Sequence, residues 1–254
     1  MNLVLNGKFC GQYLLTEQLK IDKNRVNAGD DGFLMEIDKR ASDPSEEDPY
    51  FSVQHIAQPI AVKDYDETEA SLDYVKDYLT RADNLLFSDN YLDPVEGWKS
   101  MMDMDSFVDW YLINEITKNN DAVFFSSCYM NLKRGGKLKM GPLWDYDLSM
   151  GNYSYGNVTN DVVNNPEGFY VNSVPWIARM MTDPEFMAAV KKRFNEYYVS
   201  KQRIYDQIDN IVEHTDKAYT LDFDLWRKTS ATSGLNVYRL QKTAFLKKWL
   251  HTRL

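Results

Sequence analysis

Residues 103–152 read DMDSFVDWYLINEITKNNDAVFFSSCYMNLKRGGKLKMGPLWDYDLSMGN, and this stretch decides the fold. Its first part predicts a helix with apolar residues almost all the way round, which is typical of a buried helix. Those residues are Phe107, Val108, Trp110, Tyr111, Leu112, Ile113 and Ile116. We expect Asn119 and Asn120 to end this helix, because asparagine tolerates the left-handed conformation of a C-terminal cap.

Asp121 comes directly after the predicted helix. A carboxylate at this end meets the negative pole of the helix dipole, which disfavours it by about 0.3 kcal/mol or more. The position therefore favours a functional charge. A solvated loop aspartate explains the same residue equally well on this ground alone.

A hairpin follows, and its register can be predicted from the alternation of apolar and polar residues. A two-residue loop at the glycine pair would set Leu132 opposite a lysine and mix the two faces. A three-residue loop, residues 134–136, sets Leu132 opposite Leu138 and Met130 opposite Met140. We therefore expect the three-residue loop.

Two acids follow the hairpin without a basic neighbour in sequence. If the second strand continues past Pro142, Asp145 and Asp147 lie together on its polar face, and the aromatic residues beside them point to the core. No lysine or arginine occurs in residues 141–178. Two such acids favour Mg²⁺, which takes carboxylate oxygens and leaves positions open for phosphate. Alternatively, Asp145 caps a turn and Asp147 pairs with a distant arginine.

Length and composition restrict the class of protein. The 254 residues suffice for one large domain or two small ones, and 14% aromatic residues favour a packed globule. The net charge of −9, from 38 acids and 29 bases, disfavours binding to nucleic acid or to anionic membranes. The sequence shows neither a membrane span nor a signal peptide.

The remaining elements follow from periodicity and turn residues. Residues 3–16 predict a hairpin that turns at Asn6-Gly7. A strand at 32–38 places Glu36 and Asp38 on one face. Further strands are expected at 50–54 and 59–62, and an acidic loop at 41–48. The polar loop at 151–174 is either functional or a flexible excursion. Apolar periodicity predicts helices at 72–86, 184–197, 204–219 and 235–249.

Strands come first, a buried helix and a hairpin lie in the middle, and helices follow. This order predicts an α+β fold without βαβ alternation. We expect one domain over residues 1–254, with a strand-rich part at 1–66 and a mainly helical part, including the central hairpin, at 67–254. The motifs of dinucleotide-binding, P-loop, hydrolase-elbow and zinc-protease sites do not occur.

Several blocks of this sequence resemble the CotH family of spore-coat-type protein kinases. They are NGKFCGQYLLTEQLKIDKNRV at 6–26, GFLMEIDKR at 32–40, KNNDA at 118–122 and GPLWDYD at 141–147. The resemblance covers residues 2–152 closely and the helical remainder loosely. It implies a divergent protein-kinase-like fold and transfer of the γ-phosphate of ATP to serine in secreted or spore-coat proteins. It also implies a location outside the cytoplasm or at the cell surface.

The resemblance implies roles for the central residues. Asp121 would be the catalytic acid, with Asn119 or Asn120 assisting a metal. Asp145 and Asp147 would hold Mg²⁺, the part that one aspartate plays in ordinary protein kinases. This chemistry agrees with the residues, because phosphoryl transfer needs positioning and charge neutralisation rather than an activated nucleophile on the enzyme.

The nucleotide side of the site is assigned by the same resemblance. Glu36 would lie near the adenine and Glu17 near the phosphates. Family members carry further residues ahead of the first block, including a strand and a basic phosphate-binding side chain. We expect this chain to lack that portion and to be inactive or weakly active. Substitutes for the basic side chain are Lys20, Lys23, Arg25 and Lys139.

Two hypotheses about function remain. The first is an ATP- and Mg²⁺-dependent protein serine kinase. The second is a catalytically inactive binding or structural module of a cell surface or a polysaccharide-utilisation assembly, with carbohydrate-associated partners. A glycosidase is a distant third, because its two carboxyls would have to lie about 5–5.5 Å or roughly 6.5–9.5 Å apart across an open cleft.

Overall fold

The computed structural model describes residues 1–153, 160–226 and 235–254, without the side chains of 235–240. The chain forms two compact units: Leu19–Asn195, and Met1–Gln18 together with Glu196–Leu254. The change from strand-rich to helical sequence at residue 66 falls inside the larger unit. Each unit is described separately below.

The larger unit combines one sheet with helices, which confirms the predicted α+β class. Its strands are β3 (Phe33–Ile37), β4 (Tyr50–Phe51), β5 (Ile60–Asp64), β6 (Cys128–Leu132) and β7 (Leu138–Met140). Its helices are α1 (Glu69–Leu86), α2 (Met104–Thr117), α3 (Asp161–Asn164), α4 (Pro175–Met180) and most of α5 (Pro184–Val199). Short 3₁₀ helices are η1 (Trp98–Ser100), η2 (Asn120–Ala122) and η3 (Val171–Ser173).

The sheet has the strand order β4-β5-β3-β6-β7, and every neighbouring pair is antiparallel. β3 lies in the middle, and all five of its residues are buried. A strand covered on both faces needs apolar residues at successive positions, which Phe33, Leu34 and Met35 provide. The carboxylate of Glu36 is buried within this strand and so requires partners of its own.

The central hairpin has the predicted register. Met130 lies opposite Met140 and Leu132 opposite Leu138, so the apolar residues of the two strands share one face. The backbone N–H of Gly136 donates to the carbonyl of Lys133 and closes the turn. The prediction succeeded because a slip by one residue would have turned every side chain to the wrong face.

The expected continuation of the second hairpin strand is wrong. β7 ends at Met140, and Gly141 follows with a φ of 109°. Asp145 then adopts a left-handed φ of 59°, which is incompatible with an extended strand. Asp145 and Asp147 therefore lie in an irregular segment and not on the polar face of β7.

Helix α2 is buried nearly all round, as its composition predicts. Asp103 caps its N-terminus by accepting a hydrogen bond from the backbone N–H of Ser106. The prediction that Asn119 and Asn120 cap its other end is wrong, because Lys118 occupies that position with a left-handed φ of 45°. A lysine rarely adopts this conformation, so its side chain must gain something there.

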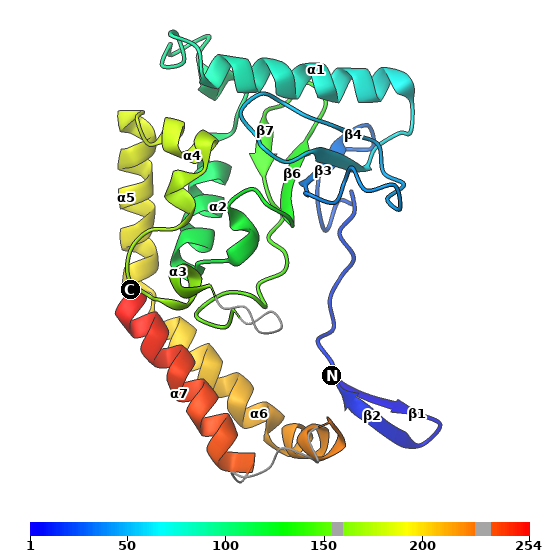
Figure 1. Ribbon diagram of the computed structural model, residues 1–254, viewed down its shortest axis with the longest axis vertical. Coiled ribbons are helices and arrows are strands. Elements are labelled where there is room, and N and C mark those ends of the chain that lie inside the picture. Colours follow the sequence, from blue (N-terminus) through cyan, green and yellow to red (C-terminus); the bar gives the residue numbers. More distant parts are fainter. Residues whose placement is uncertain (154–159, 227–234) are drawn as a thin grey trace. The chain divides into compact units, whose positions relative to one another are not determined.

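Helix α1 lies beside the turn between β6 and β7 (Figure 1). Thr68 caps its N-terminus, and its predicted apolar stripe is buried. The hydroxyl of Tyr78 donates to the carbonyls of Met101 and Gly136, at 2.9 Å each. The guanidinium of Arg134 stacks on Tyr74, 4.5 Å from the ring centroid. These contacts fix the hairpin end against the helix.

The smaller unit contains the hairpin of β1 (Asn2–Leu5) and β2 (Lys8–Gln12), with helices α6 (Gln202–Trp226) and α7 (Leu235–Arg253). Asn6 and Gly7 form the turn with φ values of 50° and 76°, so the turn is where the sequence predicts it. The backbone N–H of Gln12 donates to Asp222 of α6 over 2.7 Å. The helices predicted at 204–219 and 235–249 are both present.

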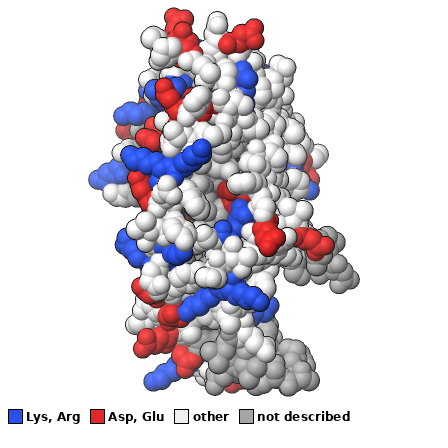
Figure 2. Space-filling view, turned by 90° about the vertical axis from the view of Figure 1, so that its left-hand side faces the viewer, with Lys and Arg blue, Asp and Glu red and all other residues white. Residues whose placement is uncertain are grey.

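Surface charge and helix composition limit the kinds of partner. On the face drawn in Figure 2, basic and acidic side chains are interspersed, unlike the continuous basic surface typical of nucleic-acid binding. Within the described ranges, every helix is too short or too polar for a membrane span.

Candidate functional site

The floor of the candidate site is formed by the C-terminal end of β3 and by the turn before β6. Glu36 accepts hydrogen bonds from the hydroxyl of Tyr129 at 2.9 Å and from the backbone N–H of Ser127 at 3.2 Å. Burial raises the pKa of Glu36, the Tyr129 hydrogen bond opposes the rise, and the charge of Asp38 adds to it. Asp38 is also buried, and it accepts a hydrogen bond from Ser126 at 3.1 Å.

Asp121 lies in η2, just beyond helix α2. Asn119 caps this short helix by accepting from the backbone N–H of Asp121 at 3.3 Å. The side-chain amide of Asn120 donates to a carboxyl oxygen of Asp121 at 2.8 Å. The backbone N–H of Phe125 donates to the carbonyl of Asp121 at 3.1 Å, which ties η2 to the turn before β6. The carboxyl is therefore half-buried and held in one orientation.

The pKa of Asp121 is raised above its ordinary value of 3.8. Burial is the main cause, and the negative charges of Asp147 and Asp38 contribute. The hydrogen bond from Asn120 and the positive charge of Arg40 oppose the rise. These effects place three charged side chains from two separate segments around Asp121.

Asp145 and Asp147 are both exposed, and their carboxyls are close enough to interact. The pKa of Asp145 is raised by burial, by the hydrogen bond with Asp147 and by the charges of Asp147 and Asp121. Neither carboxyl makes an ion pair with another described residue. The alternative in which Asp147 pairs with a distant arginine thus finds no support in the described ranges.

The structure therefore brings Asp121, Asp145 and Asp147 together, although the strand that should have aligned the last two is absent. Asn119 links the two segments, because its side-chain amide donates to the carbonyl of Asp145 at 3.3 Å. Asp38 interacts electrostatically with Glu36 and also with Asp121, so Glu36 belongs to the same group of acids. Glu17 is exposed in the smaller unit, and its assignment to the phosphates stays a prediction.

The donor set suits a metal that needs few protein ligands. Within the described residues, no three His, Cys, Asp or Glu side chains are grouped closely enough to enclose a metal. Mg²⁺ does not require such a cage, since one or two carboxylates, water and substrate phosphates complete its six positions. The paired carboxyls of Asp145 and Asp147 fit this requirement.

A second set of contacts, not predicted from the sequence, holds the segment 160–172 beside Asn120. The side-chain amide of Asn160 donates to Asn120 at 3.0 Å, and the hydroxyl of Tyr170 donates to its carbonyl at 2.8 Å. This segment belongs to the predicted polar loop at 151–174, of which 154–159 lie outside the described residues. Its contacts with Asn120 stabilise the residue next to Asp121.

Two buried charges of α2 fix the same segment. Glu115 accepts hydrogen bonds from the backbone N–H groups of three successive residues, 170–172, at 2.7–3.1 Å. The ammonium of Lys118 donates to the carbonyls of Val162, Asn165 and Glu167 at 2.5–3.1 Å. These bonds explain the left-handed backbone of Lys118, which directs its side chain into the segment. Sequence periodicity cannot reveal contacts of this separation.

Basic side chains near the acids were predicted as Lys20, Lys23, Arg25 or Lys139. Lys20 and Lys23 are exposed, and Lys139 lies 3.9 Å from Asp103. The Nε of Arg25 is buried without a hydrogen-bond partner. Their role at the phosphates stays a prediction. Arg40, which follows β3 and which the sequence argument did not name, opposes the rise in the pKa of Asp121 and of Asp145.

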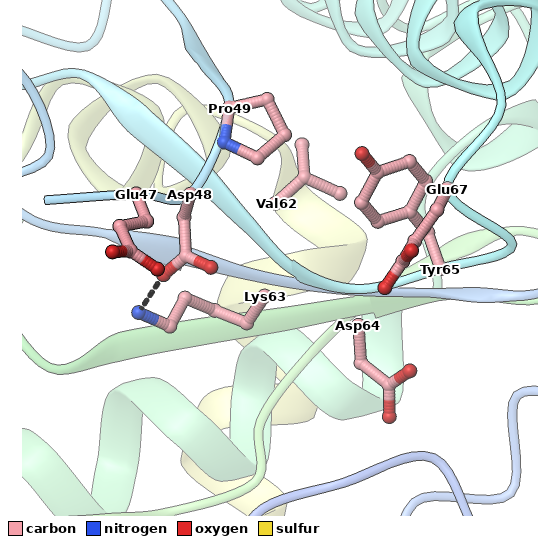
Figure 3. A pocket seen from close by; sticks show the side chains of 8 residues that line it. All are labelled: Glu47, Asp48, Pro49, Val62, Lys63, Asp64, Tyr65 and Glu67. Atoms are coloured by element: carbon pink, nitrogen blue, oxygen red, sulfur yellow. Dashed lines mark hydrogen bonds and ion pairs between the residues drawn. The ribbon is translucent and has the colours of Figure 1, made fainter.

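An acidic recess of about 440 Å³ opens beside β5. Figure 3 shows Glu47 and Asp48 on one side of it and Tyr65 and Glu67 on the other. Lys63 forms an ion pair with Asp48 and lies 3.9 Å from Glu36. Lys63 therefore lies between Asp48 of the recess and Glu36 in the floor of the site.

Comparison with known proteins identifies the family. A search of curated proteins finds none that matches the chain. The family described as CotH kinase protein matches residues 1–254, the full length of the chain. The expected resemblance is thereby confirmed, and the α+β fold described above is consistent with a kinase-like fold. Kinase-like proteins in general use ATP and Mg²⁺ and act on a protein substrate. The chain belongs to the CotH kinase protein family.

Proposed function

We propose that this protein is an ATP- and Mg²⁺-dependent kinase that transfers the γ-phosphate to serine in secreted or surface proteins. The observation that carries the proposal is the meeting of Asp121 with the Asp145–Asp147 pair, from segments 24 residues apart in sequence. Phosphoryl transfer needs one acid at the acceptor hydroxyl and others at the metal. The site supplies both.

Asp145 and Asp147 would hold Mg²⁺. The metal, when bound, neutralises charge on the phosphates during transfer. The two carboxyls repel each other unless a proton or a cation lies between them, so the pair is suited to a divalent ion. Asn119 keeps this segment beside η2 through its bond to the carbonyl of Asp145.

Asp121 would accept the proton of the acceptor serine. A base acts best when its pKa lies nearer to the working pH, and the pKa of Asp121 is raised in that direction. Asn120 orients the carboxyl by its 2.8 Å hydrogen bond and is itself held by Asn160 and Tyr170. The acid is thus positioned before substrate binds.

Glu36 and Glu17 are proposed for the nucleotide side. Glu36 would lie near the adenine. Its hydrogen bonds from Tyr129 and Ser127 support a role in holding the floor of the site in shape. Glu17 would lie near the phosphates.

Transfer of labelled γ-phosphate from ATP to serine-containing peptides, in the presence of Mg²⁺, tests the proposal. We expect weak incorporation by the wild-type chain, its loss in Asp121→Asn, and no change in Asp73→Asn, an exposed aspartate of α1. Transfer that survives Asp121→Asn would contradict the catalytic role of Asp121, and a complete absence of transfer by the wild-type chain would favour a non-catalytic binding module.

A further inference from the structure

We propose that Arg40 binds the terminal phosphate of ATP and is the cation of the phosphate site. The inference rests on the proposed function, and it assigns the basic residue that the sequence left open. A site with several carboxylates repels a triphosphate unless a metal and at least one fixed cation compensate. Arg40 is positively charged, lies beside the acids of the site and has an exposed side chain, so it can serve as this cation.

The backbone of Arg40 is anchored beside the catalytic acid. Its N–H donates to Asp38 at 3.1 Å, and Asp38 is held in turn by the hydroxyl of Ser126. The N–H of the preceding residue, Lys39, donates to the carbonyl of Phe125 at 2.9 Å. Since Phe125 is also bonded to Asp121, the segment after β3 and the turn that carries Asp121 form one hydrogen-bonded unit.

The charge of Arg40 acts on both halves of the site. It lowers the pKa of Asp121 and that of Asp145, against the other influences on each. The guanidinium therefore lies within electrostatic reach of the acceptor-side acid and of the metal-side acid. The phosphoryl group passes between these two sides, so a cation that reaches both is placed to contact it.

The guanidinium is available for a ligand. The Arg40 side chain is 64% exposed and reaches Asp38 through Nε at 3.5 Å, which is an ion pair rather than a hydrogen bond. Within the described residues no second carboxylate lies within ion-pair distance of it. Its planar fork can therefore turn to two phosphate oxygens, the geometry in which arginine binds phosphate most strongly.

Two other basic residues whose contacts reach the site are already engaged. Lys63 is paired with Asp48. Lys118 is 1% exposed, and its ammonium donates to three carbonyls. Withdrawing either of these from its partners would leave buried or paired groups unsatisfied, whereas Arg40 would exchange only a loose ion pair.

The test compares ATP with ADP. We would measure the Kd of each nucleotide with Mg²⁺ by titration calorimetry for the wild-type chain, Arg40→Gln, Arg40→Lys and Arg81→Gln. Arg81 is the control, because it is similarly exposed, pairs with Asp77 on α1 and lies over the ring of Tyr78 on the same helix. Loss of a charge-assisted phosphate contact weakens binding by about 10- to 100-fold. We expect this loss for ATP in Arg40→Gln, little change for ADP, and an intermediate loss in Arg40→Lys.

The outcomes separate the two proposals. A wild-type chain that binds ATP, with the same ATP-to-ADP ratio in Arg40→Gln, overturns the role of Arg40 and leaves the proposed function intact. A wild-type chain that binds neither nucleotide overturns both. An equal loss in Arg81→Gln would show a general effect of net charge and would also overturn the assignment.

Discussion

The carboxyl of Asp145 lies beside that of Asp147, whose negative charge raises the pKa of Asp145. Two neighbouring carboxyls repel each other when both are ionised, so the ligand-free pair is under repulsion. The left-handed backbone of Asp145 adds to the cost of the arrangement. A divalent cation would relieve this repulsion, which makes the pair a place where binding and stability are coupled.

Replacing Asp145 should abolish binding of the metal and nucleotide without lowering the stability of the ligand-free chain. In Asp145→Asn we expect the melting temperature of the ligand-free chain to stay the same or rise, because a repulsive charge is removed. The rise in melting temperature that Mg²⁺ and ATP induce in the wild-type chain should disappear. Thermal melts with and without nucleotide measure both values. A large fall in the ligand-free value would indicate a structural role for Asp145 instead.

Stability should also depend on pH through the raised acids. The pKa values of Asp121, Asp145 and Glu36 are raised by folding, so between the ordinary and the raised pKa the folded chain binds more protons than the unfolded chain. The free energy of unfolding then falls as pH rises through this window, and the full loss is present above it. We expect the ligand-free melting temperature to increase as the pH is lowered from neutral towards the ordinary pKa values of 3.8 and 4.5.

Asp145→Asn provides the control for this pH dependence, since it removes one of the three groups. The increase on lowering the pH should be smaller in the variant. Below the ordinary pKa of aspartate, the stabilisation from Asp183, whose pKa is lowered, is lost, so stability falls again. A melting temperature that decreases steadily as the pH is lowered from neutral would show that other groups dominate.

The contacts of Lys118 predict a large effect on stability. Lys118→Met leaves three part-buried carbonyls without the buried ammonium that donates to them, which should lower the free energy of unfolding by about 3 kcal/mol or more. Urea unfolding measures this change. Lys76→Met, at an exposed position of α1, is the matched control and should change stability little. A loss of under about 1 kcal/mol in Lys118→Met would mean that these bonds hold the segment only weakly.

The hairpin could be predicted from sequence because its information is local. Alternation of apolar residues around Met130 and Leu132 leaves one register that buries them, and a nearby turn is compatible with it. The same holds for helix α2, whose apolar residues require burial whatever surrounds them.

The geometry of the site could not be predicted in the same way. One left-handed residue, Asp145, ends the alternation on which the strand argument depended. The C-terminal cap at Lys118 is stabilised by carbonyls about 45 residues away, and no local propensity reports them. Arg40 acquires its neighbours only when β3 meets the turn before β6. Each of these features is a tertiary effect.

The central claim is that Asp145 and Asp147 hold a metal-bound nucleotide while Asp121 acts on the acceptor. Calorimetric titration of ATP into the chain, with Mg²⁺ and with EDTA, tests this directly. We predict Mg²⁺-dependent binding by the wild-type chain, its loss in Asp145→Asn and in Asp147→Asn, and its retention in Asp121→Asn. Binding that is unaffected by both metal-side variants, or that does not depend on Mg²⁺, would contradict the account.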